Sequence, residues 1–225
     1  MSTDLERNVV DLLEKFHLAY HLDYPVKTKY GVWKVDVYID SVPPIILSCK
    51  GLGERGLQPY ARSGTAKAMA CIAFTEFYEL KYNSELWKNA CLILVYADLP
   101  LKTAQHSFHK LLQESLGVHI FSINEKEKII RFILERAPSL MPMAYLKMAE
   151  EGEKEAHRAE KIASIPSEKK KFWLDFAESS KHYAETLKEY SKALEKTIET
   201  ASPSELEKII DTWLKPMLTE TNEVK

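Results

Sequence analysis

The 225-residue chain is poor in cysteine and glycine, with three cysteines and seven glycines. Cys49, Cys71 and Cys91 are widely spaced in apolar surroundings, which fits reduced core residues better than disulfides or a cysteine metal site. No hydrophobic segment opens the chain, and the longest apolar run, near residues 90–97, is far too short to span a bilayer. We therefore expect a cytoplasmic protein with no membrane partner.

The chain also lacks an excess of positive charge. Its net charge is −2, with +1 on residues 1–136 and −3 on residues 137–225. Proteins that bind nucleic acid mainly through phosphate contacts are usually more basic, so strong non-specific DNA binding is disfavoured. The local exception is the stretch 50–67, where Glu54 is the single acidic residue among Lys50, Arg55, Arg62 and Lys67. If the protein binds DNA, we expect these basic residues to contact it.

Residues 1–136 alternate between strand-like and helical patterns, which predicts an α/β fold. Apolar spacing predicts helices at about 5–16, 63–81 and 102–115 and after residue 124. Strands are predicted at 24–33 with a break at Gly31, and at 35–40, 45–50, 91–96 and 118–123. Val42-Pro43-Pro44 leaves room only for a turn, so the strands 35–40 and 45–50 should form an antiparallel hairpin.

Asp36 and Lys50 lie one on each strand of this predicted hairpin. In an antiparallel pair their side chains can project toward one point, a carboxylate beside an ammonium. Such a pair can hold a divalent metal ion and polarise a water molecule for attack on phosphorus. The alternative is an ion pair on the surface of a hairpin, with no chemical role.

The order of helix, hairpin, helix and strand resembles the PD-(D/E)XK nuclease superfamily, and within it most closely the archaeal Holliday-junction resolvases. The resemblance covers roughly residues 2–135 and rests on three short segments: Glu6-Arg7-Asn8, Val35-Asp36-Val37 and Leu47-Ser48-Cys49-Lys50. It implies a restriction-endonuclease-like mixed sheet flanked by helices. It also implies a Mg²⁺- or Mn²⁺-dependent DNA endonuclease that acts on branched DNA as a homodimer.

The resemblance implies that Asp36 is the central metal ligand, with Glu6 and the Cys49 carbonyl as further ligands and Lys50 orienting the attacking water. Ser48 departs from the pattern, because the family carries an acid there. Some members place serine at this position and recruit a glutamate from the following helix. Here that helix offers Glu76 and Glu79, but both lie some ten or more residues past its expected start, roughly 15 Å along the axis. We therefore expect neither to reach the site, which would leave it impaired.

Two other carboxylates, Glu54 and Asp40, lie closer to the predicted site in sequence and are alternative replacements for the missing acid. Glu6 has an alternative role of its own. Thr3-Asp4-Leu5-Glu6 has the form of a capping box, in which Glu6 would return a hydrogen bond to the helix N-terminus instead of binding metal.

The composition changes after residue 137, where Ala, Glu and Lys dominate and Gly152 is the last glycine. The pattern predicts a C-terminal helical segment, residues 137–225, with helices at about 142–163, 168–200 and 204–217. The middle helix carries an aromatic and aliphatic stripe, which we expect to pack on its neighbours or to form a dimer seam: Phe172, Phe176, Tyr183, Leu187, Tyr190 and Leu194.

Three functions remain open on the sequence. The first is a metal-dependent DNA endonuclease with an impaired site. The second is a catalytically inactive nuclease fold that binds nucleic acid or a protein partner. The third is a helical assembly protein whose α/β part is a scaffold.

Overall fold

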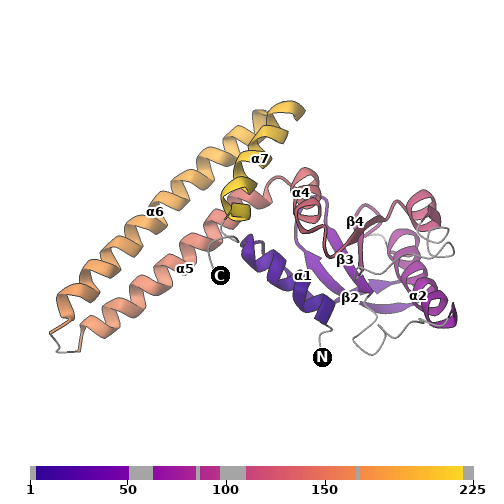
Figure 1. The fold of residues 1–225 in the computed structure, drawn as a ribbon, viewed down its shortest axis with the longest axis horizontal. Coiled ribbons are helices and arrows are strands. Elements are labelled where there is room, and N and C mark those ends of the chain that lie inside the picture. The colour runs from indigo at the N-terminus through magenta and orange to yellow at the C-terminus, as the bar shows by residue number, and fades with distance from the viewer. Residues whose placement is uncertain (1–3, 51–62, 85–86, 97–109, 166–167, 220–225) are drawn as a thin grey trace. The chain divides into compact units, whose positions relative to one another are not determined.

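The computed structural model describes residues 4–50, 63–84, 87–96, 110–165 and 168–219 (Figure 1). The chain divides into two compact units. Unit 1 contains residues 1–14 and 20–137, and unit 2 contains residues 15–19 and 138–225. Within the described residues, no helix is both long and apolar enough to cross a membrane.

Unit 1 is an α/β structure built on one mixed sheet of five strands in the order β1-β2-β3-β4-β5. The strands are β1 (His21–Thr28), β2 (Gly31–Ile39), β3 (Ile45–Lys50), β4 (Cys91–Tyr96) and β5 (His119–Ser122). The first three are antiparallel neighbours, whereas β4 is parallel to β3 and β5 is parallel to β4. The hairpin predicted between β2 and β3 is present, with Val37 opposite Leu47 and Ile39 opposite Ile45.

The prediction of one strand over 24–33 is wrong. Gly31 pairs with Thr28 at the tight turn between β1 and β2, so the segment contributes to two strands of a hairpin. Gly31 has φ of 153°, a conformation that residues with a Cβ rarely adopt. The glycine therefore marks a chain reversal that we interpreted as a break within a strand.

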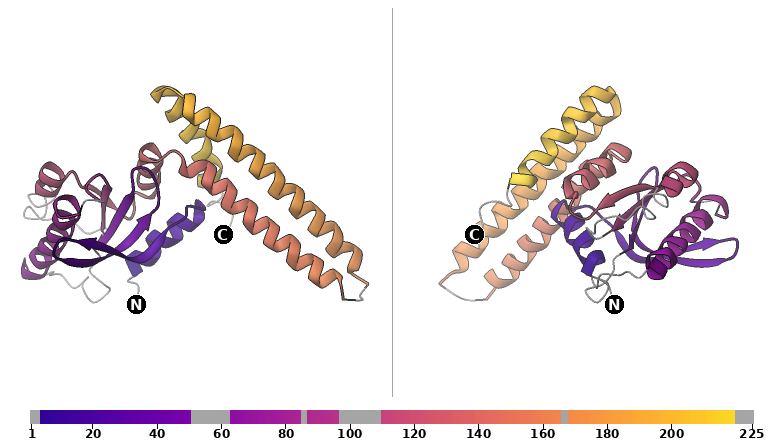
Figure 2. Two further views of the ribbon diagram at one scale, coloured as in Figure 1. Left: turned by 180° about the vertical axis from the view of Figure 1, so that it is seen from behind. Right: turned by 45° about the vertical axis from the view of Figure 1, so that its right-hand side comes forward.

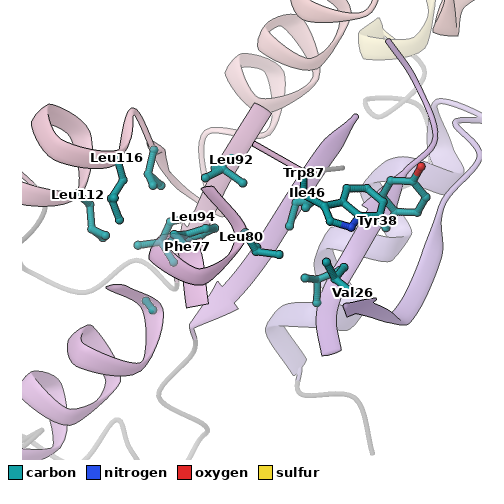
Figure 3. Close-up of a cluster of buried hydrophobic side chains, with 13 residues drawn as sticks. Val26, Tyr38, Ile46, Phe77, Leu80, Trp87, Leu92, Leu94, Leu112 and Leu116 are labelled. Atoms are coloured by element: carbon teal, nitrogen blue, oxygen red, sulfur yellow. The ribbon is translucent and has the colours of Figure 1, made fainter. Parts of the chain in front are cut away.

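In the described part of unit 1 the helices are α1 (Asp4–Lys15), α2 (Ser63–Tyr82) and α4 (Lys126–Arg136), with a π-helical turn η2 (Leu112–Leu116) before β5. α2 packs on the sheet through Ala73, Phe77 and Leu80, whose spacing places them on one helical face. These side chains meet a cluster from the strands that includes Tyr38, Ile46, Leu92 and Leu94 (Figure 3). α1 is amphipathic and buries Leu5, Val9, Leu12 and Leu13.

Unit 2 contains α5 (Leu140–Ala163), α6 (Lys170–Thr200) and α7 (Pro203–Thr219). α5 and α6 run side by side as an antiparallel hairpin (Figure 2). Their contact is made mainly by small residues, Ala149, Ala156 and Ala159 on α5 and Ala177 and Ala184 on α6. α7 begins directly after Ser202, whose backbone N–H and hydroxyl both donate hydrogen bonds to the Glu205 carboxylate.

Of the two roles left open for the stripe of α6, packing on neighbouring helices within the chain does not hold for its aromatic members. Phe172 is 60% exposed, Phe176 41%, Tyr183 51% and Tyr190 61%, whereas Leu187 is buried against α5. The small residues of α6 lie about 100° around the helix from the aromatic ones and occupy the α5 contact instead. An exposed apolar row therefore follows most of the length of α6.

Candidate active site

Asp36 lies where β2 separates from β3. The backbone pairing of the two strands ends at Val37 and Leu47. Beyond this pair, the Asp36 carboxylate connects β2 to β3 in place of the backbone. Its Oδ2 accepts a hydrogen bond from the Cys49 backbone N–H at 2.6 Å and lies 3.2 Å from the Ser48 hydroxyl. The strand geometry thus fixes the carboxylate against the last three residues of β3.

Lys50 and Asp36 point to the same place, as the hairpin predicts. Lys50 Nζ lies 3.4 Å from Asp36 Oδ2 and 3.1 Å from Glu76 Oε2. The side chains of Lys50, Asp36 and Glu76 are 17%, 20% and 4% exposed, so all three are largely withdrawn from solvent. This burial argues against the alternative of a surface ion pair.

Glu76 is the residue that sequence reasoning wrongly excluded. It lies on α2 beside Phe77 and one turn from Ala73 and Leu80, on the face that packs against the sheet. The middle of α2, not its first turn, crosses over β3, so the axial distance from the start of the helix was the wrong measure. A glutamate on the apolar face of a sheet-packing helix was the available signal, because a buried carboxylate needs partners.

Ser48 connects the two carboxylates. It is fully buried, with its hydroxyl 3.1 Å from Glu76 Oε2 and 3.2 Å from Asp36 Oδ2. A hydroxyl has one proton to donate, so it bonds one carboxylate at a time while lying within reach of both. Glu76 Oε1 is also buried and has no hydrogen-bond partner within the described part of the chain.

The site contains one basic and two acidic side chains. Burial alone would lower the pKa of the Lys50 ammonium, but the adjacent Glu76 and Asp36 raise it above its ordinary value. Burial raises the pKa of Glu76; Lys50 opposes this shift and Asp36 adds to it. With both carboxylates ionised, one ammonium balances two negative charges, and a net charge of −1 remains in a nearly dry site.

Cys49 and Glu6 lie at the margin of this group. Burial raises the pKa of the Cys49 thiol far above its ordinary value, and the negative charges of Asp36 and Glu6 add to the effect. The thiol therefore stays protonated and is not a nucleophile. Glu6 is half-buried on α1, and its charge reaches Cys49, between Ser48 and Lys50. Thr3 is outside the described residues, so the capping role of Glu6 is untested.

The other predicted residues lie elsewhere or beyond the described part. Asp40 accepts a hydrogen bond from the Tyr38 hydroxyl at 3.0 Å and does not join the site. Glu54, Arg55 and Arg62 lie outside the described residues, as does the side chain of Lys67. The predicted DNA contact therefore stays a prediction.

The residues present suit a hard divalent cation in part. Mg²⁺ prefers oxygen ligands and is held in proteins by as few as one or two carboxylates. Asp36 and Glu76 supply two carboxyl groups, and within the described residues the buried Glu76 Oε1 has no hydrogen-bond partner. Among the residues that the structure describes, no three or more His, Cys, Asp or Glu side chains are grouped so that they could hold a metal ion. The described residues of the site therefore offer an open set of carboxyl oxygens and no closed metal centre.

Comparison with known proteins gives no family for this chain. No family model, no curated protein and no solved structure matches it.

Proposed function

We propose that the protein is a metal-dependent nuclease that hydrolyses phosphodiester bonds in DNA, with Asp36, Glu76 and Lys50 as its central residues. The observation that carries the proposal is the position of Glu76. Its buried carboxylate lies within 3.1 Å of both Lys50 and Ser48, so the acid that β3 lacks is supplied from α2. In this proposal Ser48 does not impair the site, which differs from the expectation drawn from the sequence.

In this proposal Asp36, Glu76 and the Cys49 carbonyl hold Mg²⁺ or Mn²⁺, with Glu6 as a further carboxylate near the site. A bound divalent ion lowers the pKa of a coordinated water and offsets the negative charge that develops on the phosphate. Lys50 donates hydrogen bonds from a buried ammonium and is positioned to orient the attacking water. Ser48 keeps the two carboxylates in place by hydrogen bonding to either one.

DNA with branches is the proposed substrate, and the basic residues Lys50, Arg55, Arg62 and Lys67 are the proposed contacts. Because few phosphates would be neutralised, affinity should be modest and should fall steeply with salt. Cutting both strands at a branch needs two active sites, so the proposal includes a homodimer.

The test combines calorimetric titration of Mn²⁺ with cleavage of supercoiled and four-way-junction DNA. Asp36→Asn and Glu76→Gln should each abolish cleavage and weaken Mn²⁺ binding at least tenfold, since each removes a charged oxygen ligand. Asp40→Asn is the matched control, because it removes a carboxylate that follows β2 at the hairpin turn and lies outside the site. If wild type neither binds Mn²⁺ nor cleaves DNA, the proposal is wrong.

A second function has one observation in its favour. Lys50 contacts both Asp36 and Glu76 and thereby offsets part of their charge without any metal, as in a purely structural ion-pair network. An inactive nuclease fold that binds nucleic acid or a protein partner would keep this network for stability alone. DNA binding that is retained in the Asp36→Asn variant, with no Mn²⁺ binding and no cleavage in wild type, would favour this alternative.

A further inference from the structure

The exposed face of α6 has a regular pattern of large and small residues. Aromatic residues recur at positions 176, 183 and 190, seven residues apart, and a fourth lies at 172. The positions between them on the same face carry small side chains. These are Ser179, Thr186 and Ala193, followed by Thr197. Seven-residue repeats with two positions on one face are the pattern of a helix that pairs with another helix.

The pattern is self-complementary when a second α6 runs in the opposite direction. With the two-fold axis between residues 184 and 185, Tyr183 of one copy lies level with Thr186 of the other. The same register places every aromatic residue opposite a small one, in the pairs Phe176 with Ala193, Tyr190 with Ser179 and Phe172 with Thr197. Alternation of large and small residues across facing positions is what close packing of two helices needs.

Charge on the flank of the stripe agrees with this register. On the side away from α5, the positions next to the stripe are Asp175, His182, Glu189 and Lys196. In an antiparallel pair the same flank of each helix meets, so Asp175 faces Lys196 of the second copy and His182 faces Glu189. The Asp175–Lys196 pair is complementary in charge, a histidine ring nitrogen can hydrogen-bond with the Glu189 carboxylate, and the two-fold symmetry repeats both pairs. Flanking charges of this kind set partner orientation in paired helices.

A groove at the end of the stripe supplies a receptor for the aromatic side chains. It has a volume of about 430 Å³ and lies between α6 and α7, with Tyr145 of α5 on one side. Tyr190, Ala193 and Thr197 of α6 line it, and Trp213 of α7 forms part of its wall. Ala193 and Thr197 are the residues that the register places opposite Phe176 and Phe172 of the second copy. The two phenylalanines of each copy would therefore enter the groove of the other.

The area available suffices for a stable dimer. An aromatic side chain offers 150–250 Å² of surface, so the four half-exposed rings of each copy contribute about 100 Å² apiece, and eight rings about 800 Å². The small residues and flanking charges raise the total above the 1,000 Å² or so that a specific interface needs. The paired segment, residues 172–197, extends roughly 38 Å along the helix axis.

We propose that two copies of the chain associate through an antiparallel, two-fold symmetric pairing of their α6 helices, with Phe172 and Phe176 of each copy inserted between α6 and α7 of the other. Such an interface is isologous and closes after two subunits, so it yields a dimer and not a filament. The proposal uses unit 2 alone and does not depend on the proposed nuclease activity.

The full-length protein tests this by sedimentation velocity or light scattering. Wild type should have a mass of twice 25.9 kDa. The double variant Phe176→Glu/Tyr190→Glu should dissociate, with a dissociation constant raised roughly 100-fold or more, because buried aromatic anchors carry most of the energy of an interface. Leu174→Glu is the matched control, since this leucine is 46% exposed on the opposite side of α6 and its replacement should leave the dimer intact. Circular dichroism confirms that each variant remains helical.

A charge exchange tests the register itself. Asp175→Lys alone should weaken the dimer, and Asp175→Lys combined with Lys196→Asp should restore it. A monomeric wild type, or a dimer that survives Phe176→Glu/Tyr190→Glu, would overturn the proposal. Failure of the exchanged pair to recover the dimer would overturn the two-fold register.

Discussion

Replacing Lys50 with methionine removes the ammonium that contacts both carboxylates of the candidate site while keeping the length and apolar stem of the side chain. The two remaining acids, Asp36 and Glu76, are 20% and 4% exposed and would face each other without their cation. Removing one partner of a buried ion pair costs about 3–5 kcal/mol. Asp36 keeps its bond from the Cys49 N–H, so we expect about 3 kcal/mol of lost unfolding free energy at pH 7 without metal.

Divalent metal should recover much of this loss. A ligand at 100 times its dissociation constant stabilises the folded state by about 2.7 kcal/mol. In Lys50→Met, Mn²⁺ no longer competes with the Lys50 ammonium for the carboxylates of Asp36 and Glu76. Mn²⁺ should therefore stabilise the variant more than it stabilises wild type. The proposed DNA cleavage should not return, because the ammonium proposed to orient the attacking water is absent.

Urea unfolding followed by tryptophan fluorescence, in EDTA and in millimolar Mn²⁺, measures both effects. Lys34→Met is the matched control, an exposed lysine on β2, and should change stability by less than about 0.5 kcal/mol. A loss below about 1 kcal/mol for Lys50→Met would refute the role of the ammonium in balancing the buried charge. A large loss that Mn²⁺ does not reduce would show that the carboxylates do not bind metal.

Three further predictions follow from local contacts. Glu76→Ser should abolish Mn²⁺ binding by calorimetry, and adding Ser48→Glu should restore it by moving the carboxylate from helix to strand. The hydrogen bond from Lys128 lowers the pKa of Glu125, so the stabilisation by this bond is present above the unfolded pKa of Glu125 and is lost as pH falls. Glu125→Gln should therefore lower the unfolding free energy by about 0.5 kcal/mol at pH 7, and by about half of that amount or less below pH 4. A Cβ at Gly152 would meet its nearest neighbour at 3.5 Å, so Gly152→Ala should raise the melting temperature, whereas Gly152→Leu should cost about 1–3 kcal/mol by separating α5 from α6.

The parts of the fold that depend on short-range pattern could be predicted from sequence. The strand 91–96 and the helix from residue 63 occur where the pattern placed them, because a buried parallel strand and a helix carry their own hydrophobic periodicity. The segment 24–33 could not be resolved by the same argument. One glycine is compatible both with a tight turn between two strands and with a bend within a single strand. Only the pairing between strands distinguishes these two arrangements.

Packing between α5 and α6 shows where a pattern of large apolar residues misleads. The sequence left two roles open for the residues with most apolar surface, such as Phe176 and Tyr183, namely packing on neighbouring helices or forming a dimer seam. The contact instead uses Ala177 and Ala184 against Ala149 and Ala156, because small side chains allow two long helices to approach closely. A row of alanines at seven-residue spacing was the available signal, and it leaves the aromatic row exposed.

Ser48 and Glu76 can be understood only together. A glutamate in place of Ser48 would add a third carboxylate beside Asp36 and Glu76, with Lys50 as the ammonium between them. Such crowding would force one acid to take up a proton. A serine there leaves space for the carboxylate that arrives from α2 and offers it a hydrogen bond at 3.1 Å. A motif defined along one strand can therefore look degenerate in this chain, although a second carboxyl group reaches the strand from a helix residue that lies 28 positions from Ser48 in sequence.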